Sequence, residues 1–440
     1  MEFNNGEKIK LEGGQVITIA NPSGDWPKEG GQGFVYIVEL SGGCYSALKW
    51  YKPSYLKGLS KNGNLEYFKE NLKENIGREA PSNKFIWPKA ITEDKSGSFG
   101  YIMSLKPNDY TNFEDIYLKR TVFASFKASI DCAINMVDAF RTLHKKGFFY
   151  LDLNDGNFFI NPINGDVLVC DNDNVTANPK FNIGKPGYVA PELVRGDEGV
   201  LSSDLTDSHS LAVVLFKLLI RHDPMEGVKF VTAGMLSPKK QRELYGTNPV
   251  FIYDENDKTN RPVNGLHLNA LNLWTKYPEY LRDAFTKTFS AGLNNPRERI
   301  TELEWKKILL RIRDSIIFCP CGKDIYLYLK QENQKITCSC GKVHNYPRKM
   351  ELNESVIYLF PGNSLLGCHL DGNDEDCAEV GKVVASKSDQ QRWGLKNLSS
   401  TVWKVTKSTG ESEEVNKDGI VVIEKGAKIE FNSKLSATIM

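Results

Sequence analysis

Two aspartates and an asparagine follow one another at short spacings in the middle of the chain. Asp152 lies in the stretch YLDLNDGN, Asn157 follows five residues later, and Asp171 ends the apolar run VLVCD after fourteen more. A positioned carboxylate can accept or orient the proton of a hydroxyl group, and Mg²⁺ prefers hard oxygen ligands. The spacing indicates a site that handles a proton at Asp152 and a magnesium ion at Asp171. The alternative is a pair of polar surface turns.

A glycine-rich turn and a lysine precede these residues. The stretch KEGGQGFVY contains Gly30, Gly31 and Gly33, where backbone N–H groups can approach phosphate oxygens without a side-chain clash. Lys49, in ALKW, lies fourteen residues after Val35 and is a cation that can pair with phosphates. A flexible hairpin turn and a solvated lysine explain each feature alone. Their order and spacing favour phosphate binding.

Strand-like and helical patterns divide the first three quarters of the chain. From about residue 14 to 104, GFVYIVEL and CYSALKWY are rich in β-branched and aromatic residues and are separated by the turn signal SGG. One helix is expected there, because NLEYFKENLKENI places four apolar residues on one face: Leu65, Phe68, Leu72 and Ile76. Farther along, to about residue 314, helical patterns dominate, including SFKASIDCAINMVDAFRTLHKKG and the core-helix pattern LAVVLFKLLI.

Further motifs complete a pattern that resembles a Hanks-type serine/threonine protein kinase, from about residue 14 to 314. GKPGYVAPE is similar to the end of a kinase activation segment and contains Glu192. DLTDSHSLAVVLF contains Asp207, which in kinases holds the catalytic loop, and NPRERIT contains Arg299, the expected ion-pair partner of Glu192. A narrower resemblance, carried by ALKWY, PSNKFIWP, GYIMSLKP and VCDNDNV, is to a bacterial subfamily. Its members are often encoded beside a PP2C-type phosphatase and a von Willebrand factor A protein, in tellurite-resistance-associated triads.

The resemblance implies an α+β, bilobal kinase fold, with a small lobe at about 14–104 and a large lobe at about 105–314. It also implies ATP- and Mg²⁺-dependent transfer of the γ-phosphate to a serine or threonine of a protein, with Asp152 as catalytic base. Mg²⁺ is then held by Asn157 and Asp171. The residues expected to bind ATP are Gly30, Gly31, Gly33, Val35, Lys49, Asn157 and Asp171. The phosphatase and the von Willebrand factor A protein become expected partners, and the protein substrate is left open.

The catalytic loop departs from the kinase pattern at two neighbouring positions. Tyr150 stands where a histidine usually packs beneath the active site, and tyrosine can still pack there. Leu151 replaces the arginine that in many kinases clamps a phosphorylated activation loop. Activation by that phosphorylation is therefore not expected. Thr176 is the only serine or threonine between Asp171 and Glu192.

The three residues that begin at Asp171 correspond to the metal-binding triplet of kinases, and they also depart from the kinase pattern. Asn172 and Asp173 replace its phenylalanine and glycine. Because glycine eases changes of backbone conformation, its loss predicts a loop that is fixed in one state. Asp173 also offers a second carboxylate near the metal.

Asn154 is the departure that bears most on activity, because serine/threonine kinases usually place a lysine there to stabilise the transferring phosphoryl group. Lys185, where the family usually has a threonine, is our hypothesis for a substitute cation, and a solvated loop lysine is the alternative. A kinase helix also offers a glutamate to Lys49. Three glutamates of the predicted helix are open for that role: Glu66, Glu70 and Glu74.

Three functions are compatible with these departures. The favoured one is an active Mg-ATP serine/threonine protein kinase. The second is a pseudokinase, a nucleotide-binding scaffold without turnover. The third is a small-molecule kinase, and the complete APE segment with Asp207 and Arg299 argues against it, since small-molecule phosphotransferases generally lack that segment.

Four of the nine cysteines form two Cys-x-Cys-Gly knuckles, CPCG and CSCG. Sixteen residues separate the second and third of them, enough for a β-hairpin. Four thiolates suit a structural Zn²⁺ with a closed tetrahedral shell, and two disulfides are the alternative. We predict a zinc ribbon at 315–350 with the ligands Cys319, Cys321, Cys338 and Cys340. His344 is near but is not needed as a ligand.

The last 90 or so residues read as short strands separated by Gly, Asn, Asp and Ser, which predicts a β-sandwich at 351–440. The stretches WGLKNLSSTVWKV and IEKGAKIEF resemble a forkhead-associated (FHA) domain, a phosphothreonine-binding module. The arginine and the Ser-x-x-His element of such domains are missing, so a structural or docking role is expected. Trp393 and Trp403 are expected in its core.

The overall composition excludes several classes of protein. The 440 residues are 40% hydrophobic and 25% charged, as in ordinary soluble proteins, and the net charge of +1 gives no basic excess for nucleic acid. The first residues, MEFNNGEKIK, lack the apolar core of a signal peptide. A cytoplasmic protein with no membrane or nucleic-acid partner is expected.

Overall fold

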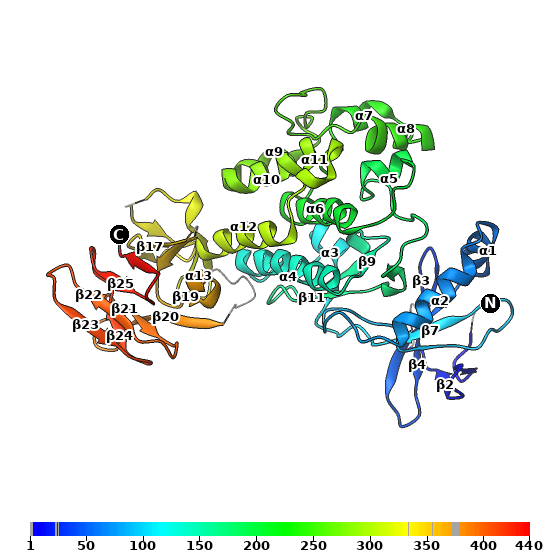
Figure 1. The fold of residues 1–440 in the computed structure, drawn as a ribbon, viewed down its shortest axis with the longest axis horizontal. Helices are drawn as coiled ribbons and strands as arrows, with labels where there is room; N and C mark the ends of the chain where they lie inside the picture. The colour runs from blue at the N-terminus through cyan, green and yellow to red at the C-terminus, as the bar shows by residue number, and fades with distance from the viewer. Residues whose placement is uncertain (1–2, 23, 25, 333, 354, 372–377) are drawn as a thin grey trace.

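The computed structural model describes residues 3–22, 24, 26–332, 334–353, 355–371 and 378–440. The chain passes from a sheet-rich part at one end, through a helical part, to a second β-rich part at the other end (Figure 1). Antiparallel sheets and helices occur together, which fits the predicted α+β class. Within the described residues, no helix is both long and apolar enough to cross a membrane.

The N-terminal part is a seven-stranded antiparallel sheet in the order β1-β2-β4-β5-β7-β6, with β3 paired to β4. Its strands are β1 (Lys8–Lys10), β2 (Val16–Ile19), β3 (Lys28–Glu29), β4 (Gly33–Glu39), β5 (Tyr45–Tyr51), β6 (Ala90–Ile91) and β7 (Gly100–Met103). Its helices are α1 (Pro53–Lys61) and α2 (Leu65–Ile76). Helix α2 lies where the apolar pattern predicts it, with Phe68 and Leu72 buried, whereas α1 is not predicted by that pattern.

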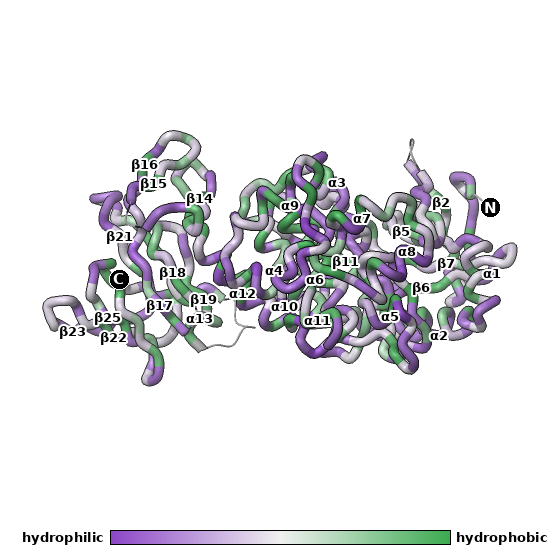
Figure 2. The backbone as a smooth tube through the Cα atoms, turned by 90° about the horizontal axis from the view of Figure 1, so that it is seen from above, coloured by the Kyte–Doolittle hydropathy of each residue, from purple (hydrophilic) through white to green (hydrophobic). Residues whose placement is uncertain are grey.

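The helical part surrounds the buried helix α6. Figure 2 shows hydrophobic segments gathered around α6 and β11. The helices are α3 (Phe113–Tyr117), α4 (Phe126–Lys145), α5 (Pro191–Arg195), α6 (Asp204–Ile220), α7 (Val228–Ala233), α8 (Pro238–Arg242), α9 (Leu268–Leu273), α10 (Glu279–Phe289), α11 (Ala291–Asn294) and α12 (Glu302–Asp314). Polar caps fix the ends of the longest ones: the Ser125 hydroxyl accepts from the N–H of Ala128 at the start of α4, and Ser203 and Thr206 form a capping box on α6.

Short strands lie between the two parts and within the helical part. They are β8 (Thr111–Asn112), β9 (Phe149–Tyr150), β10 (Phe158–Ile160), β11 (Val167–Val169) and β12 (Val175–Thr176). Short helical turns are η1 (Asp155–Asn157), η2 (Asn172–Asn174), η3 (Glu243–Thr247), η4 (Trp274–Lys276), η5 (Pro296–Glu298) and η6 (Leu327–Leu329). Strand β9 pairs with β12, and β10 pairs with β11, both antiparallel.

The C-terminal part contains three hairpins and two four-stranded sheets. The hairpins are β13 (Ile316–Phe318) with β14 (Asp324–Tyr326), β15 (Ile336–Thr337) with β16 (Val343–His344), and β17 (Arg348–Leu352) with β18 (Ser355–Leu359). One sheet has the order β19 (Ser364–Leu366), β20 (Glu379–Ala385), β21 (Trp393–Asn397), β24 (Ile420–Val422). The other has β23 (Ser412–Val415), β22 (Trp403–Thr406), β25 (Lys428–Glu430), β26 (Ser436–Thr438), and α13 (Gly367–Asp371) follows β19.

The two sheets share one hydrophobic core. Leu395 and Val421 of the first sheet and Val405 and Ile429 of the second belong to it, and Trp403 in the second sheet is fully buried. Trp393 is only half-buried and packs against this core. Two four-stranded sheets around one shared core are compatible with the predicted β-sandwich, and both the sandwich and the FHA-like assignment stay predictions.

Candidate active site

Two strand pairings bring the predicted catalytic residues together. Residues 151–157 connect β9 to β10, and residues 170–174 connect β11 to β12, so the pairing of β9 with β12 and β10 with β11 places the two loops face to face. The N–H of Cys170 donates to the carbonyl of Asn157 at 2.8 Å, and the N–H of Leu151 donates to that of Asn174 at 2.9 Å. Asp152, Asn157 and Asp171 therefore meet, although fourteen residues separate the last two.

Lys49 reaches the same place from strand β5. It is only 4% exposed, and its Nζ lies 3.3 Å from Asp171 Oδ1, 3.0 Å from Asp173 Oδ2 and 2.8 Å from Gln32 Oε1. Burial disfavours the ammonium, but the two carboxylates outweigh it and hold the pKa of Lys49 above its ordinary value. The lysine therefore stays charged at neutral pH.

The two carboxylates beside Lys49 differ in their surroundings. The Asp171 side chain is 40% exposed, whereas that of Asp173 is fully buried. Both oxygens of Asp173 already accept hydrogen bonds, from Lys49, from the Tyr51 hydroxyl at 2.7 Å and from the Tyr101 hydroxyl at 3.0 Å. Asp171 can thus offer an oxygen to a metal, and Asp173 is committed to its three donors.

The backbone at Asp171 is also unusual. Its φ is +56°, in the left-handed region that side chains other than glycine rarely adopt. Strain of this kind is retained where the surrounding structure fixes it, often at functional sites. Here the hydroxyl of Tyr150 donates to the carbonyls of Cys170 and Asp171, from a ring that is 1% exposed. Tyr150 thus packs beneath the site as predicted and also anchors the loop that carries Asp171.

Asp152 is held by groups of two loops. Its Oδ1 accepts from Asn154 Nδ2 at 3.2 Å and from the backbone N–H of Lys185 at 3.1 Å. Burial raises the pKa of Asp152 to about 6, although both hydrogen bonds act in the opposite direction. Asn154, which stands at the usual lysine position, therefore orients the carboxylate. Asn154 also donates its N–H to Asn157 Oδ1 at 2.9 Å, which fixes the Asn157 amide.

The backbone of Lys185 lies beside Asp152, but its ammonium has a different partner. Its Nζ is 3.2 Å from Asp155 Oδ1, and its side chain is 55% exposed. Asp155 is shared with Lys217 of α6, whose Nζ lies 3.2 Å from Asp155 Oδ2. Lys185 is on the exposed side of this ion pair, while Asp155 is mostly buried and keeps Lys217 as a second counter-ion, so Asp155 does not depend on Lys185 alone.

The glycine-rich turn forms the hairpin between β3 and β4, directly over Lys49. Val35 is the register partner of Lys49, and the N–H of Gly30 donates to the carbonyl of Gly33 at 2.8 Å. A Cβ at Gly33 would lie 2.2 Å from the Trp50 carbonyl oxygen, so only glycine fits. Gly31 has open space around it, so packing does not explain that glycine.

The glutamates of α2 do not pair with Lys49. Glu66, Glu70 and Glu74 are all exposed, and Glu74 lies 3.5 Å from Arg78. The buried face of α2 carries two amides instead, and Asn71 and Asn75 both donate to the Val175 carbonyl.

Thr176 is inaccessible to a modifying enzyme in this structure. It is 1% exposed, and its hydroxyl lies 2.7 Å from the Tyr67 hydroxyl of α2. Residues 176–178 are therefore tied to α2 by neutral hydrogen bonds from Tyr67.

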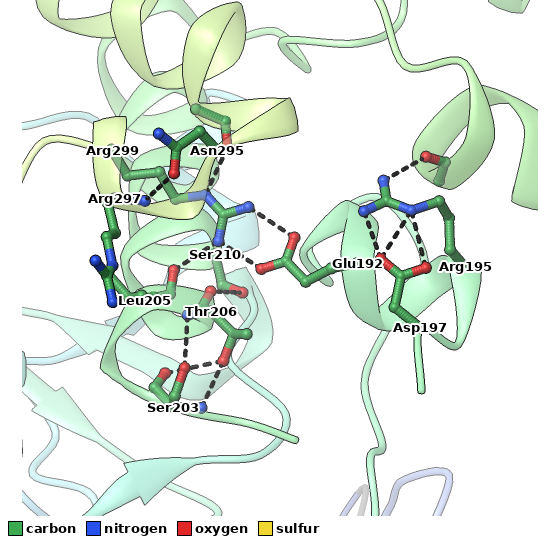
Figure 3. Close-up of polar contacts among 12 residues, drawn as sticks. Glu192, Arg195, Asp197, Ser203, Leu205, Thr206, Ser210, Asn295, Arg297 and Arg299 are labelled. Atoms are coloured by element: carbon green, nitrogen blue, oxygen red, sulfur yellow. Dashed lines mark hydrogen bonds and ion pairs between the residues drawn. The ribbon is translucent and has the colours of Figure 1, made fainter. Parts of the chain in front are cut away.

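The predicted supporting ion pair is present. Arg299 donates two hydrogen bonds of 2.7 Å to the two oxygens of Glu192 and a third to the Leu205 carbonyl (Figure 3). Asp207 accepts from the Tyr150 N–H at 2.8 Å and lies 2.9 Å from His144 Nε2. Burial lowers the pKa of His144, but its bonds to Asp207 and Glu302 outweigh this and raise it to about 10.

The four knuckle cysteines form a second candidate centre. Their Sγ atoms all lie within 4.8 Å of one another, and the Cys319–Cys340 and Cys321–Cys338 sulfur distances are both 3.7 Å. A disulfide has its sulfurs about 2.05 Å apart, whereas tetrahedral thiolates about 2.3 Å from zinc stand about 3.8 Å apart. The residues fit Zn²⁺ and do not form disulfides. His344 Nε2 lies 3.2 Å from Cys319 Sγ, outside the set of four.

Comparison with known families supports the interpretation of the site around Asp152 and Asp171. Residues 91–272 match the model of the protein kinase domain. A search of curated proteins found no match. The matched segment contains the loops around Asp152 and Asp171, and it begins after the glycine-rich turn and Lys49, whose places in the site rest on the geometry alone. The match and the geometry together support a protein kinase domain in this chain, with ATP, a divalent metal and a protein substrate.

Proposed function

We propose that this chain is an active serine/threonine protein kinase that uses ATP and Mg²⁺, with Asp152 as its catalytic base. The observation that carries the proposal is the state of Asp152. One oxygen of this carboxylate is fixed by Asn154 and by the N–H of Lys185, in a partly buried site that also holds Asp171 and Lys49. A base must be placed and ionised to accept a proton, and both conditions are met above its pKa of about 6.

Asp171 and Asn157 are the residues that hold Mg²⁺ in this proposal. When bound, the ion neutralises charge on the phosphates of ATP and orients them. Asp171 is suited to this role because its side chain is 40% exposed and can present an oxygen to a metal ion. The hairpin with Gly30, Gly31, Gly33 and Val35 covers the nucleotide, and the open space at Gly31 leaves room for phosphate oxygens beside the backbone.

Lys185 is proposed as the cation that stabilises the transferring phosphoryl group. Its backbone already touches Asp152, so its side chain starts within reach of the transferred group. Lys217 shares Asp155 with it, so Asp155 keeps a counter-ion when Lys185 turns away. Mutation of Lys185 to alanine is expected to lower kcat, and an unchanged kcat would remove this role.

The C-terminal part is proposed to be a zinc ribbon at 315–350 followed by an FHA-like sandwich at 351–440, after a kinase domain at 14–314. The 3.7 Å sulfur distances support the zinc site. The resemblance to the bacterial kinase subfamily is the ground for proposing a PP2C-type phosphatase and a von Willebrand factor A protein as partners.

Incorporation of label from γ-labelled ATP tests the proposal. The purified chain is incubated with Mg²⁺ and casein as a generic acceptor, beside an Asp152→Asn variant that keeps the size of the side chain. Label on casein with the unmutated chain alone supports the proposal. Thermal stabilisation by ATP without any label supports the pseudokinase, and label on small molecules but never on protein supports a small-molecule kinase.

A further inference from the structure

Two residues that contact Lys49, Gln32 and Asp173, have no role in the proposed reaction, and Asp173 is the charged one. Asp173 is a fully buried carboxylate two residues after the proposed metal ligand, and it touches neither solvent nor the open part of the site. We propose that Asp173 is the positioning residue that holds Lys49, in place of a glutamate from helix α2. This inference rests on the proposed kinase function, because it assigns Lys49 to the phosphates of ATP.

Geometry favours Asp173 over Asp171 as the anchor of the lysine. Both oxygens of Asp173 lie 3.0 Å from Lys49 Nζ, whereas Asp171 makes one contact at 3.3 Å. A buried ammonium needs a carboxylate with well-placed hydrogen bonds. Only Asp173 is buried enough to remain paired while the exposed Asp171 turns to a metal ion.

Two tyrosines hold Asp173 in turn. The Tyr51 hydroxyl comes from the end of β5, two residues after Lys49, and the Tyr101 hydroxyl comes from the adjacent strand β7. Tyr101 is also the register partner of Lys49 across the two strands. Lysine, tyrosines and aspartate therefore form one buried network between the sheet and the metal-binding loop, and the position of Lys49 is set within it.

Helix α2 contributes no charge to this network. Its three glutamates are exposed, and its buried amides reach the metal-binding loop at the Val175 carbonyl, at 2.8 Å from Asn71 and 2.7 Å from Asn75. The ion pair that the kinase resemblance expects between helix and strand is thus replaced by an ion pair between loop and strand. It follows that Lys49 stays in place without any charge from α2.

Four variants distinguish a Lys49 that is held by Asp173 from a Lys49 that is held by a glutamate of α2. They are Asp173→Asn, Glu66→Gln, Glu70→Gln and Glu74→Gln. For each, kcat and the KM values for Mg-ATP and for casein are measured, together with the Kd for Mg-ATP by calorimetry. We expect Asp173→Asn to lower kcat/KM for Mg-ATP by about 100-fold, a loss typical of a displaced reacting group, with the KM for casein unchanged. All three glutamine variants are expected to stay within about twofold of the unmutated chain, as surface changes do.

A purely structural role for Asp173 is excluded by a second variant and by a stability measurement. Tyr101→Phe removes one donor to Asp173 and keeps the ring, so the fold is retained, and we expect a loss of about tenfold in kcat/KM for Mg-ATP. Thermal unfolding is recorded for each variant, and kinetics are measured well below the transition. A loss of about 100-fold in kcat/KM for Mg-ATP in any one glutamine variant would overturn the inference. Normal kinetics in both Asp173→Asn and Tyr101→Phe would overturn it as well.

The nucleotide-binding measurement keeps this inference separate from the proposed function. If the unmutated chain binds Mg-ATP but transfers no phosphate, the kinase proposal fails. The anchor role is then decided by Kd alone. A Kd raised about tenfold or more in Asp173→Asn, but not in the glutamine variants, supports the anchor, and equal Kd values in all four variants contradict it.

Discussion

The pH dependence of phosphoryl transfer should report the ionisation of Asp152. Its pKa of about 6 is set by burial, which outweighs the hydrogen bonds from Asn154 and Lys185. The carboxylate form is the base, so activity is present above this pKa and is lost as the pH falls through it. A group with pKa about 6 is roughly 97% ionised at pH 7.5 and roughly 9% ionised at pH 5, so kcat/KM should fall by about tenfold between these values.

The variant Asn154→Ala assigns this midpoint to Asp152. It removes a hydrogen bond to the ionised carboxylate, worth about 1.5 kcal/mol, and one pKa unit corresponds to about 1.4 kcal/mol. The acidic midpoint should therefore rise by about one unit. Asn294→Ala, an exposed asparagine of α11, is the matched control and should leave the midpoint unchanged.

Initial rates from pH 5 to 8.5 at saturating casein give kcat/KM for Mg-ATP, and calorimetry at each pH corrects for changes in nucleotide binding. Protonation of ATP itself shifts every variant equally, so the difference between variants belongs to the protein. A midpoint that is the same in the unmutated chain and in Asn154→Ala would refute the assignment of the base.

Three further predictions concern stability. The pKa of Asp152 in the folded state lies above its ordinary value of 3.8, so the stability of the fold decreases as the pH rises from about 4 to about 6. Asp152→Asn should therefore raise the free energy of unfolding at pH 7.5 by about 1–3 kcal/mol, measured by urea titration. A destabilised variant would contradict the argument that burial raises this pKa. Glu192→Gln leaves the buried Arg299 guanidinium without its carboxylate and should cost about 3–5 kcal/mol. Glu298→Gln removes an exposed ion pair with Lys287 and should lower the free energy of unfolding by under about 1 kcal/mol in the same titration. Equal losses in Glu192→Gln and Glu298→Gln would contradict the claim that burial makes the first pair more important. Removal of metal by a chelator, or Cys321→Ser, should abolish one equivalent of bound zinc by elemental analysis and lower the thermal stability of the C-terminal part; a chain purified without zinc and unaffected by chelator would refute the zinc site.

Local patterns in the sequence predict most of the elements, although not helix α1, and they select Asp152, Asn157 and Asp171 as candidate site residues. Asp152, Asn157 and Asp171 meet because each lies within two residues of a short strand and these strands pair with one another, and apolar runs such as VLVCD mark such strands well. The short C-terminal strands expected from the sequence are also present, and Trp403 is buried as predicted, whereas Trp393 is only half-buried. These features depend on the local pattern of apolar and polar residues, and a single sequence is enough to show that pattern.

The partners of Lys49 could not be predicted in the same way. The choice between Glu66, Glu70, Glu74 and a loop residue depends on how α2 is turned about its axis relative to β5, and the apolar face of the helix alone does not fix this. The signal that was available is the buried pair of asparagines at i and i+4, Asn71 and Asn75, which marks an inward polar face. Asp173 stands out in the sequence because it replaces the glycine of the kinase pattern. Its contacts with Tyr51 and Tyr101, which are far from it in the sequence, depend on the tertiary fold.

Phosphoamino acid analysis of labelled casein tests the central claim most directly. The unmutated chain, supplied with γ-labelled ATP and Mg²⁺, is compared with Asp152→Asn at pH 7.5. The proposed function predicts label on serine or threonine from the unmutated chain and a loss of about 100-fold or more in the variant, in line with removal of a general base. Equal labelling by both proteins, or no label from the unmutated chain while it binds Mg-ATP, would contradict it.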